Sequence, residues 1–224
     1  MSNGCLETTR RTVPVLSNPR PRQLGYGREL PQAIAALRMG ATVLDLGSGD
    51  GAYSFLAATA VGESGRIIGV ETAPEMIAQA RANVIHNGFY HVSFRLGELE
   101  HLPVADRIAD AVISHYGINP SYCKTQVFRE AFRVLKPGGH LAIVDTVATK
   151  ILPEDVEEND VLYTECLSGV LMLDDIEDML RAAGFDRVQS QIKQNRNGFR
   201  PASATSRALK PIVAPALIEA VKPA

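Results

Sequence analysis

Residues 42–55, TVLDLGSGDGAYSF, join an apolar run to three closely spaced glycines and a segment that can be helical. The run is interrupted only by one acid, Asp45, and such apolar runs are typical of strands buried on both faces. Gly47, Gly49 and Gly51 follow at alternate positions, and their lack of a Cβ atom lets a ligand approach the backbone. The stretch therefore predicts the first strand, a ligand-binding turn and the next helix of an α/β fold.

The rest of the chain repeats this alternation of strand and helix. Further buried strands are predicted at 65–71, 91–97, 109–116 and 140–147, and helices at 31–38, 73–87, 125–135 and 174–184. Such an order predicts a mostly parallel sheet with helices on both faces. The turn dipeptide Asn197-Gly198 separates two late strands, 185–192 and 202–210, which predicts an antiparallel pair at the end of the sheet.

These elements suggest one main domain with appendages. We expect an N-terminal arm or cap at 1–29, the α/β domain at 30–210 and a C-terminal tail at 211–224. Within the domain, residues 150–172 are acidic and helix-compatible, and they are predicted to be an insertion that caps the sheet edge.

Composition excludes several classes of protein. The net charge of −2 does not favour a nucleic-acid partner or a polybasic membrane anchor. No apolar run approaches the roughly 20 residues of a transmembrane helix. The Arg-rich start would suit a mitochondrial presequence, but its prolines disfavour the helix that such a segment needs. Cys5, Cys123 and Cys166 are odd in number and far apart, so neither a disulfide framework nor a zinc site is predicted, and the cytoplasm is the expected location.

The acids around the glycine turn indicate the charge of its ligand. Gly47, Gly49 and Ala52 loosely fit a dinucleotide fingerprint, in which a helix N-terminus binds a pyrophosphate. Asp45 and Asp50 would repel that anion and would suit a ligand with ammonium and sulfonium groups. Glu71 follows at the end of the next strand, where a carboxylate can accept both hydroxyls of a ribose.

Taken together, VLDLGSGDG, IIGVE, PEMIAQARAN and FREAFRVLKPGG resemble the class I S-adenosylmethionine (SAM) dependent methyltransferases over roughly residues 24–210. The resemblance implies a seven-stranded Rossmann-like α/β sheet with an antiparallel late strand, SAM as methyl donor and S-adenosylhomocysteine (SAH) as product. For Met76, the helical spacing alone also allows an ordinary core position. The implied cofactor-binding residues are Asp45, Gly47, Ser48, Gly49, Gly51, Glu71, Thr72, Met76, Glu98, Leu99 and Ser114.

Within that family, the sequence is similar to the arsenite methyltransferases through LGYG (24–27), YTECLSGVL (163–171) and SATSRALK (203–210). Those enzymes bind trivalent arsenic through several cysteine thiolates, because a soft centre prefers soft sulfur ligands. Cys166 matches one of these cysteines, but Arg28 and Tyr116 stand where the other two are expected.

These replacements suggest a different acceptor. Arg28 can clamp an anionic group or be a solvated surface arginine, and His115 can take a proton or shape the pocket wall. Tyr26 and Tyr116 can orient the acceptor as catalytic residues or line the pocket as apolar surface. Cys166 and Asn119 are expected to bind the substrate. We therefore expect methyl transfer to a small molecule with an oxygen, nitrogen, carbon or sulfur nucleophile, by a monomer or homodimer without a metal cofactor.

Two alternatives remain open. The first is arsenite methylation by Cys166 together with Cys5 or Cys123. The second is a protein that binds SAM without transferring its methyl group, either as a cyclase-like catalyst or as a regulatory binder.

Overall fold

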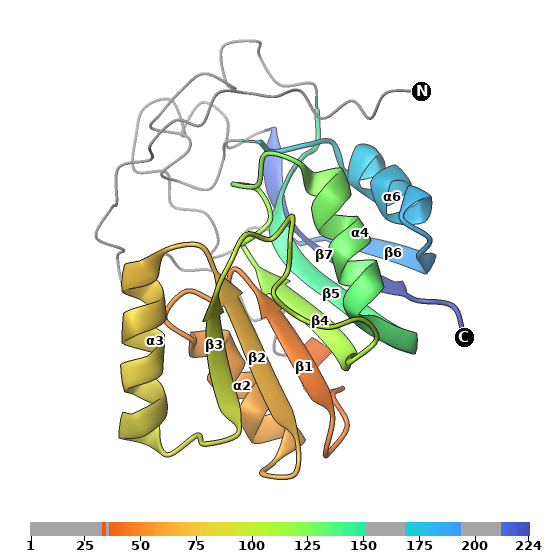
Figure 1. The fold of residues 1–224 in the computed structure, drawn as a ribbon. Helices are drawn as coiled ribbons and strands as arrows, with labels where there is room; N and C mark the ends of the chain where they lie inside the picture. Colours follow the sequence, from red (N-terminus) through yellow and green to blue (C-terminus); the bar gives the residue numbers. More distant parts are fainter. Residues whose placement is uncertain (1–32, 35, 151–168, 194–211) are drawn as a thin grey trace.

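The computed structural model describes residues 33–34, 36–150, 169–193 and 212–224. It contains a seven-stranded sheet in the order β3-β2-β1-β4-β5-β7-β6 (Figure 1). β1 to β5 pair in parallel, and β7 runs antiparallel to both β5 and β6. The predicted seven-stranded, mostly parallel sheet is confirmed. The strands are β1 (Thr42–Leu46), β2 (Arg66–Glu71), β3 (Val92–Leu96), β4 (Ala109–His115), β5 (Leu135–Ala148), β6 (Asp186–Ile192) and β7 (Val213–Val221).

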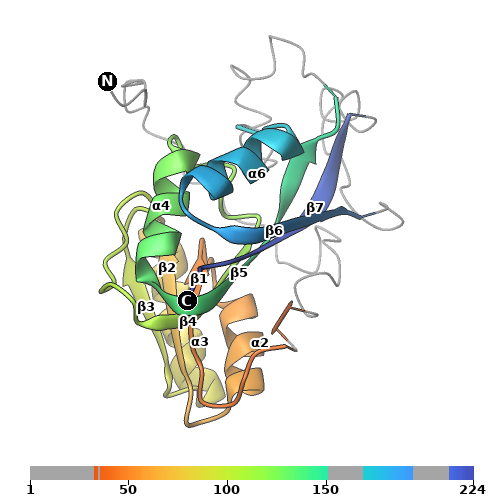
Figure 2. The same cartoon turned by 90° about the vertical axis from the view of Figure 1, so that its right-hand side faces the viewer.

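Helices cover both faces of this sheet (Figures 1 and 2). The described helices are α2 (Ala52–Val61), α3 (Pro74–Asn87), α4 (Lys124–Val134) and α6 (Leu173–Ala182). Successive strand residues point to opposite faces, so Val43 packs in the core beneath α2 and α3, whereas Leu44 packs in the core beneath α4 and α6. Burial on both faces explains why the apolar run of β1 is continuous.

Strand order reverses between β1 and β4. The chain builds β1, β2 and β3 outward in one direction and then returns to place β4 on the other side of β1. In open α/β sheets, ligands bind at such a reversal, beyond the carboxyl ends of the strands. The turn after β1 and the loop after β4 are therefore the expected ligand-binding segments.

The expected tail at 211–224 is wrong, because Val213–Val221 forms β7 between β5 and β6. The prolines in this segment argued against a strand. Pro215, however, lies next to Ala216, which forms the last pair with β6 opposite Ile192. Proline is tolerated at such positions, where the ladder ends. The strand predicted at 202–210, its Asn-Gly turn, the arm and most of the insertion lie outside the described residues.

Within the described residues, no helix combines the length and apolarity needed to cross a membrane.

Candidate cofactor and acceptor site

The turn after β1 (Gly47–Gly51, the cofactor loop) requires its glycines. Gly47, Gly49 and Gly51 have φ angles of 68°, 54° and 91°, in the left-handed region that disfavours other residues. A Cβ atom on Gly51 would lie 2.6 Å from the Phe94 ring. The loop is held against β2, since the N–H groups of Gly47 and Ser48 donate to the Val70 carbonyl at 2.9 and 3.1 Å. The result is a rigid, bare backbone cradle at the predicted place.

Asp45 lies beneath this cradle and is only 1% exposed. Its carboxylate accepts a hydrogen bond from the Ser54 hydroxyl at 2.6 Å, which fixes the first turn of α2 against β1. Burial raises the pKa of the Asp45 carboxyl, the Ser54 hydrogen bond lowers it and the Glu71 carboxylate raises it, and the net result is a pKa of about 7. Asp45 therefore shapes the site from within the core.

Asp50 closes the cofactor loop at the start of α2. Its carboxylate accepts the Ala52 N–H at 3.2 Å, one of the donors that a pyrophosphate would need at a helix N-terminus. This contact agrees with the interpretation that the loop does not bind a dinucleotide.

Glu71 links the end of β2 to the cofactor loop. One carboxylate oxygen accepts the Gly49 N–H at 2.9 Å, and the other accepts the N–H groups of Thr72 and Ala73 at 2.7 and 3.0 Å. The Thr72 hydroxyl also donates to Glu71, at 3.2 Å. The oxygen that accepts the Gly49 N–H has the capacity for one further donor, such as a ribose hydroxyl, whereas the other oxygen already receives three donors.

Met76 projects toward the cofactor loop rather than into the core. Its Cε atom lies 3.7 Å from the position that a Cβ on Gly49 would take. The core-facing residues of α3 are Ile77 and Ala80, whereas Met76 is only half-buried. This placement favours a ligand contact for Met76 over an ordinary core position.

The remaining predicted cofactor residues are placed less directly. Glu98 is exposed and pairs with His101 at 3.7 Å. The Leu99 side chain belongs to the hydrophobic core, so only its backbone is left to border a ligand. Ser114 is fully buried, and its hydroxyl donates to the Leu46 carbonyl at 2.8 Å, which joins β4 to β1. The buried Ser48 hydroxyl has no hydrogen-bond partner among the described residues.

Three aromatic rings gather where β4 ends. His115 stacks on Tyr53 of α2 with ring centroids 3.8 Å apart, and the Tyr116 ring meets His115 edge-on at 4.6 Å. Tyr116 has a φ of 56°, in the left-handed region that non-glycine residues adopt uncommonly and at a cost in free energy. Tyr53 was missed by the sequence analysis. Its place two residues after Gly51 gave a signal, because the start of α2 and the end of β4 flank the same strand.

The environment of His115 bears on whether it takes a proton or shapes the wall of the site. Burial lowers the pKa of the His115 imidazole to about 3, so the ring is neutral across the physiological range. An imidazole with that pKa is a weak base, which argues against the predicted proton transfer and favours a role in shaping the wall of the site.

The segment after β4, residues 116–121 (the acceptor loop), is held by buried polar groups. Asn119, predicted to bind substrate, is 2% exposed, and its side-chain amide donates to the Thr146 carbonyl at 2.8 Å. Asp145 of β5 accepts the N–H groups of Ile118 and Asn119, both at 3.1 Å. Asn119 therefore fixes the loop rather than presenting its amide to a ligand.

The cofactor and acceptor loops touch each other. A Cβ on Gly47 would lie 2.7 Å from the Gly117 Cα, and a Cβ on Gly117 would lie 2.6 Å from the Leu46 carbonyl oxygen. Both positions must be glycine for the loops to approach this closely. The loop expected to bind the methyl donor therefore lies directly against the loop expected to bind the acceptor.

Several predicted residues lie outside the described residues, namely Tyr26, Arg28, Cys5 and Cys166. The sequence predicted no disulfide framework, yet Cys123 is disulfide-bonded. Cys123 immediately precedes α4, two residues after the acceptor loop.

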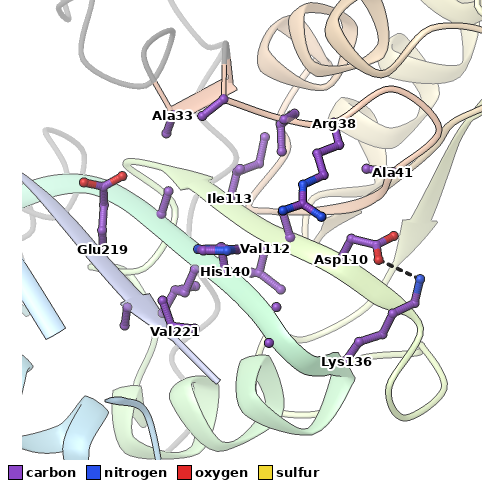
Figure 3. A pocket seen from close by; sticks show the side chains of 18 of the residues that line it. Ala33, Arg38, Ala41, Asp110, Val112, Ile113, Lys136, His140, Glu219 and Val221 are labelled. Carbon is purple, nitrogen blue, oxygen red and sulfur yellow. Dashed lines mark hydrogen bonds and ion pairs between the residues drawn. The ribbon is translucent and has the colours of Figure 1, made fainter. Parts of the chain in front are cut away.

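A separate cleft of about 740 Å³ opens at the other end of the sheet, beside the amino ends of β1, β4 and β5. Figure 3 shows Arg38 reaching over it, with Asp110 paired to Lys136 at 2.7 Å on its wall. Because ligands of this architecture bind at the carboxyl ends, the cleft is distinct from the site described above.

Comparisons with known proteins agree with this geometry. A family model described as a methyltransferase domain matches residues 37–197. The arsenite methyltransferase of Halobacterium salinarum is 45% identical over 201 residues, which cover 90% of this chain and 51% of that protein. The chain spans about half the length of this and a second arsenite methyltransferase, from Aquipseudomonas alcaligenes, which is 40% identical over 183 residues covering 77% of this chain.

Solved structures give the same result. An arsenic (III) S-adenosylmethionine methyltransferase from Chlamydomonas reinhardtii superposes with a TM-score of 0.68 at 27% identity, over 87% of this chain and 73% of that one. The [4+2]-cyclase SpnF, at 21% identity and a TM-score of 0.71, covers 87% of this chain and 80% of its own and shares the fold.

The bare glycine cradle, the carboxylate of Glu71 at its edge and Met76 facing it suit the nucleoside and amino-acid parts of SAM. The chain belongs to the methyltransferase-domain family, as a class I SAM-dependent member related to the arsenite methyltransferases.

Proposed function

We propose that this chain transfers the methyl group of SAM to a small-molecule acceptor held at the aromatic wall beside the acceptor loop. The observation that carries the proposal is the contact between the two loops through Gly47 and Gly117. It brings the residues expected to hold the donor next to Tyr53, His115 and Tyr116.

When bound, SAM supplies an electrophilic methyl group, which an acceptor lone pair takes as the sulfur keeps the bonding electrons. The chain's contribution is mainly to hold acceptor and donor in line, an effect that can contribute several kcal/mol. Glu71 would bind the ribose, and the rigid cofactor loop would fix the amino-acid part. The half-buried rings of His115 and Tyr116 would orient the acceptor and exclude water.

Calorimetry with SAM and SAH, followed by measurement of SAH release across a panel of acceptors, tests this proposal. We expect binding of both ligands and acceptor-dependent SAH release. The absence of binding at millimolar SAM would contradict it.

We also propose that the protein is cytoplasmic, has no nucleic-acid partner and acts as a monomer or homodimer. The net charge of −2 supports the second point. Sedimentation with and without a nucleic-acid mixture tests the partner and the oligomeric state.

Arsenite methylation is the second candidate function. The curated relatives support it, and Cys123 supplies one sulfur two residues after the acceptor loop. Two thiolates would hold a soft trivalent centre better than one. Under reducing conditions, Cys123→Ser should then abolish arsenite-dependent SAH release and leave SAM affinity intact. Unchanged turnover by the variant would exclude this candidate.

A further inference from the structure

Two buried charged residues contact the acceptor loop. Asp145 is 2% exposed and Lys124 is 8% exposed, and Lys124 opens α4. Burying charges of this kind costs free energy unless their hydrogen bonds are satisfied. A lysine in the first turn of a helix also opposes the helix dipole. Neither residue therefore occupies its position because of secondary-structure preference.

Their hydrogen bonds converge on one short segment. The Lys124 ammonium donates to the carbonyls of Asn119 and Ser121 at 2.9 and 3.1 Å. Asp145 accepts the N–H groups of Ile118 and Asn119, and its other oxygen accepts the Thr146 N–H at 2.8 Å. Asp145 of β5 thus binds N–H groups of the acceptor loop, and Lys124 of α4 binds its carbonyl groups.

The acceptor loop is also the one that touches the cofactor loop. Gly117 lies between the strained Tyr116 and the first residue held by Asp145. Because Gly117 packs against the Gly47 backbone, a shift of the acceptor loop must move the cofactor loop or open a gap beside it.

We infer that Asp145 and Lys124 are positioning residues that hold the acceptor loop against the cofactor loop, so that cofactor affinity depends on a pair of residues placed on β5 and α4. The inference rests on the proposed function, since it takes SAM and SAH as the ligands of the cofactor loop. It assigns the pair a role in coupling the two ligand sites.

The charge on Asp145 makes this coupling dependent on pH. Burial raises the pKa of Asp145 to about 6, although the three backbone N–H groups and Lys124 act in the opposite direction. The charged groups near the pair are Lys124 itself, which faces Asp145, and Glu100, which faces Lys124. Protonation of Asp145 removes an acceptor from the loop and part of the attraction for Lys124, so SAH affinity should fall as pH drops through about 6.

The test compares SAH dissociation constants for the wild type, Asp145→Asn and Lys124→Met between pH 5 and 8. At pH 7.5 both variants should bind SAH about tenfold more weakly, within the usual range of coupling between sites. Asp145→Asn should also lose the component of the pH profile with a midpoint near 6. Any contribution of Asp45 to the pH profile is common to the wild type and Asp145→Asn, so it cancels in the ratio of their SAH dissociation constants.

A second carboxylate–lysine pair provides the control. Asp110 and Lys136 form an ion pair at the opposite end of the sheet, and Asp110 also accepts a backbone N–H, from Thr42 at 2.8 Å. Asp110→Asn and Lys136→Met should leave SAH affinity unchanged even where they lower the melting temperature. If Asp145→Asn fails to fold, Lys124→Met and the milder Lys124→Arg carry the test, with Lys124→Arg retaining more affinity.

The outcomes separate this inference from the proposed function. Wild-type protein that binds SAH while folded Asp145→Asn and Lys124→Met bind it equally well overturns the positioning role alone. Wild-type protein with no affinity for SAM or SAH overturns the proposed function and this inference together.

Discussion

At the scale of single residues, the two acids of the opening stretch have different tasks. Asp50 accepts a helix N–H beside the cofactor loop, whereas Asp45 is buried and holds Ser54. Their charge in the sequence already argued against a pyrophosphate ligand. The sequence could not show that Asp45 is buried, because burial arises from α2 and the neighbouring strands rather than from local sequence.

The buried carboxyl of Asp45 should make stability depend on pH. Its pKa is raised to about 7 from an ordinary value of 3.8, so the folded protein binds this proton more tightly than the unfolded chain does. The stability that this proton contributes is complete below pH 3.8 and is lost as pH rises through 7. As pH rises from 5 to 8, the wild type should therefore lose roughly 1–3 kcal/mol of unfolding free energy that Asp45→Asn does not lose.

Urea unfolding of both proteins at several pH values measures this difference, in which the contributions of other carboxylates cancel. A constant difference between the two proteins would show that Asp45 ionises as it does in water.

At the scale of elements, the decisive feature is the junction of β1, the cofactor loop and α2. All three glycines were predicted to favour a ligand, and the structure adds a packing reason for two of them, Gly47 against Gly117 and Gly51 against a distant ring. Gly51 combines a left-handed φ of 91° with a neighbour, the Phe94 ring, only 2.6 Å from where a Cβ would lie. The ring belongs to β3, on the far side of β2, and no local pattern revealed that contact.

Gly51→Ala should therefore cost more than a left-handed glycine normally does. Gly88, which ends α3 with a φ of 72°, has nothing within 4 Å of the same position and provides a matched control. We expect about 1 kcal/mol of destabilisation for Gly88→Ala, and about 2–4 kcal/mol for Gly51→Ala because strain and overpacking add. Denaturant unfolding compares them, and equal losses would show that the Phe94 ring moves aside without cost.

At the scale of the whole molecule, the last described residues complete the sheet. β7 pairs along its whole length with β5 and joins β6 to the sheet. Lys222 then donates to the carbonyls of Phe132 and Leu135 at 2.7 and 2.8 Å, which satisfies the C-terminal end of α4. The segment expected to be a tail thus joins β5 to β6 and also contacts the end of α4.

A substitution in β7 should show this role. Ile218 is 1% exposed within the core beneath α4 and α6, so Ile218→Ala should destabilise the protein by about 2–5 kcal/mol. Pro223→Ala, at an exposed position two residues after β7, should change stability by less than about 0.5 kcal/mol. Thermal unfolding distinguishes these values, and a negligible effect of Ile218→Ala would mean that the segment is a tail after all.

The sequence by itself determined the alternation of buried strands and helices, the glycine turn and the family, because buried strands, capped helices and glycine spacing are local patterns with few physical solutions. It also placed Glu71 at the end of the second strand, where its carboxylate meets the cofactor loop. Only the tertiary structure decided that Tyr53 stacks on His115 and that Asp145 holds a loop 26 and 27 residues away. It also decided that residues 213–221 form an interior strand. Each of these depends on groups distant in the chain that meet only after the sheet has formed, so no short stretch of sequence encodes it.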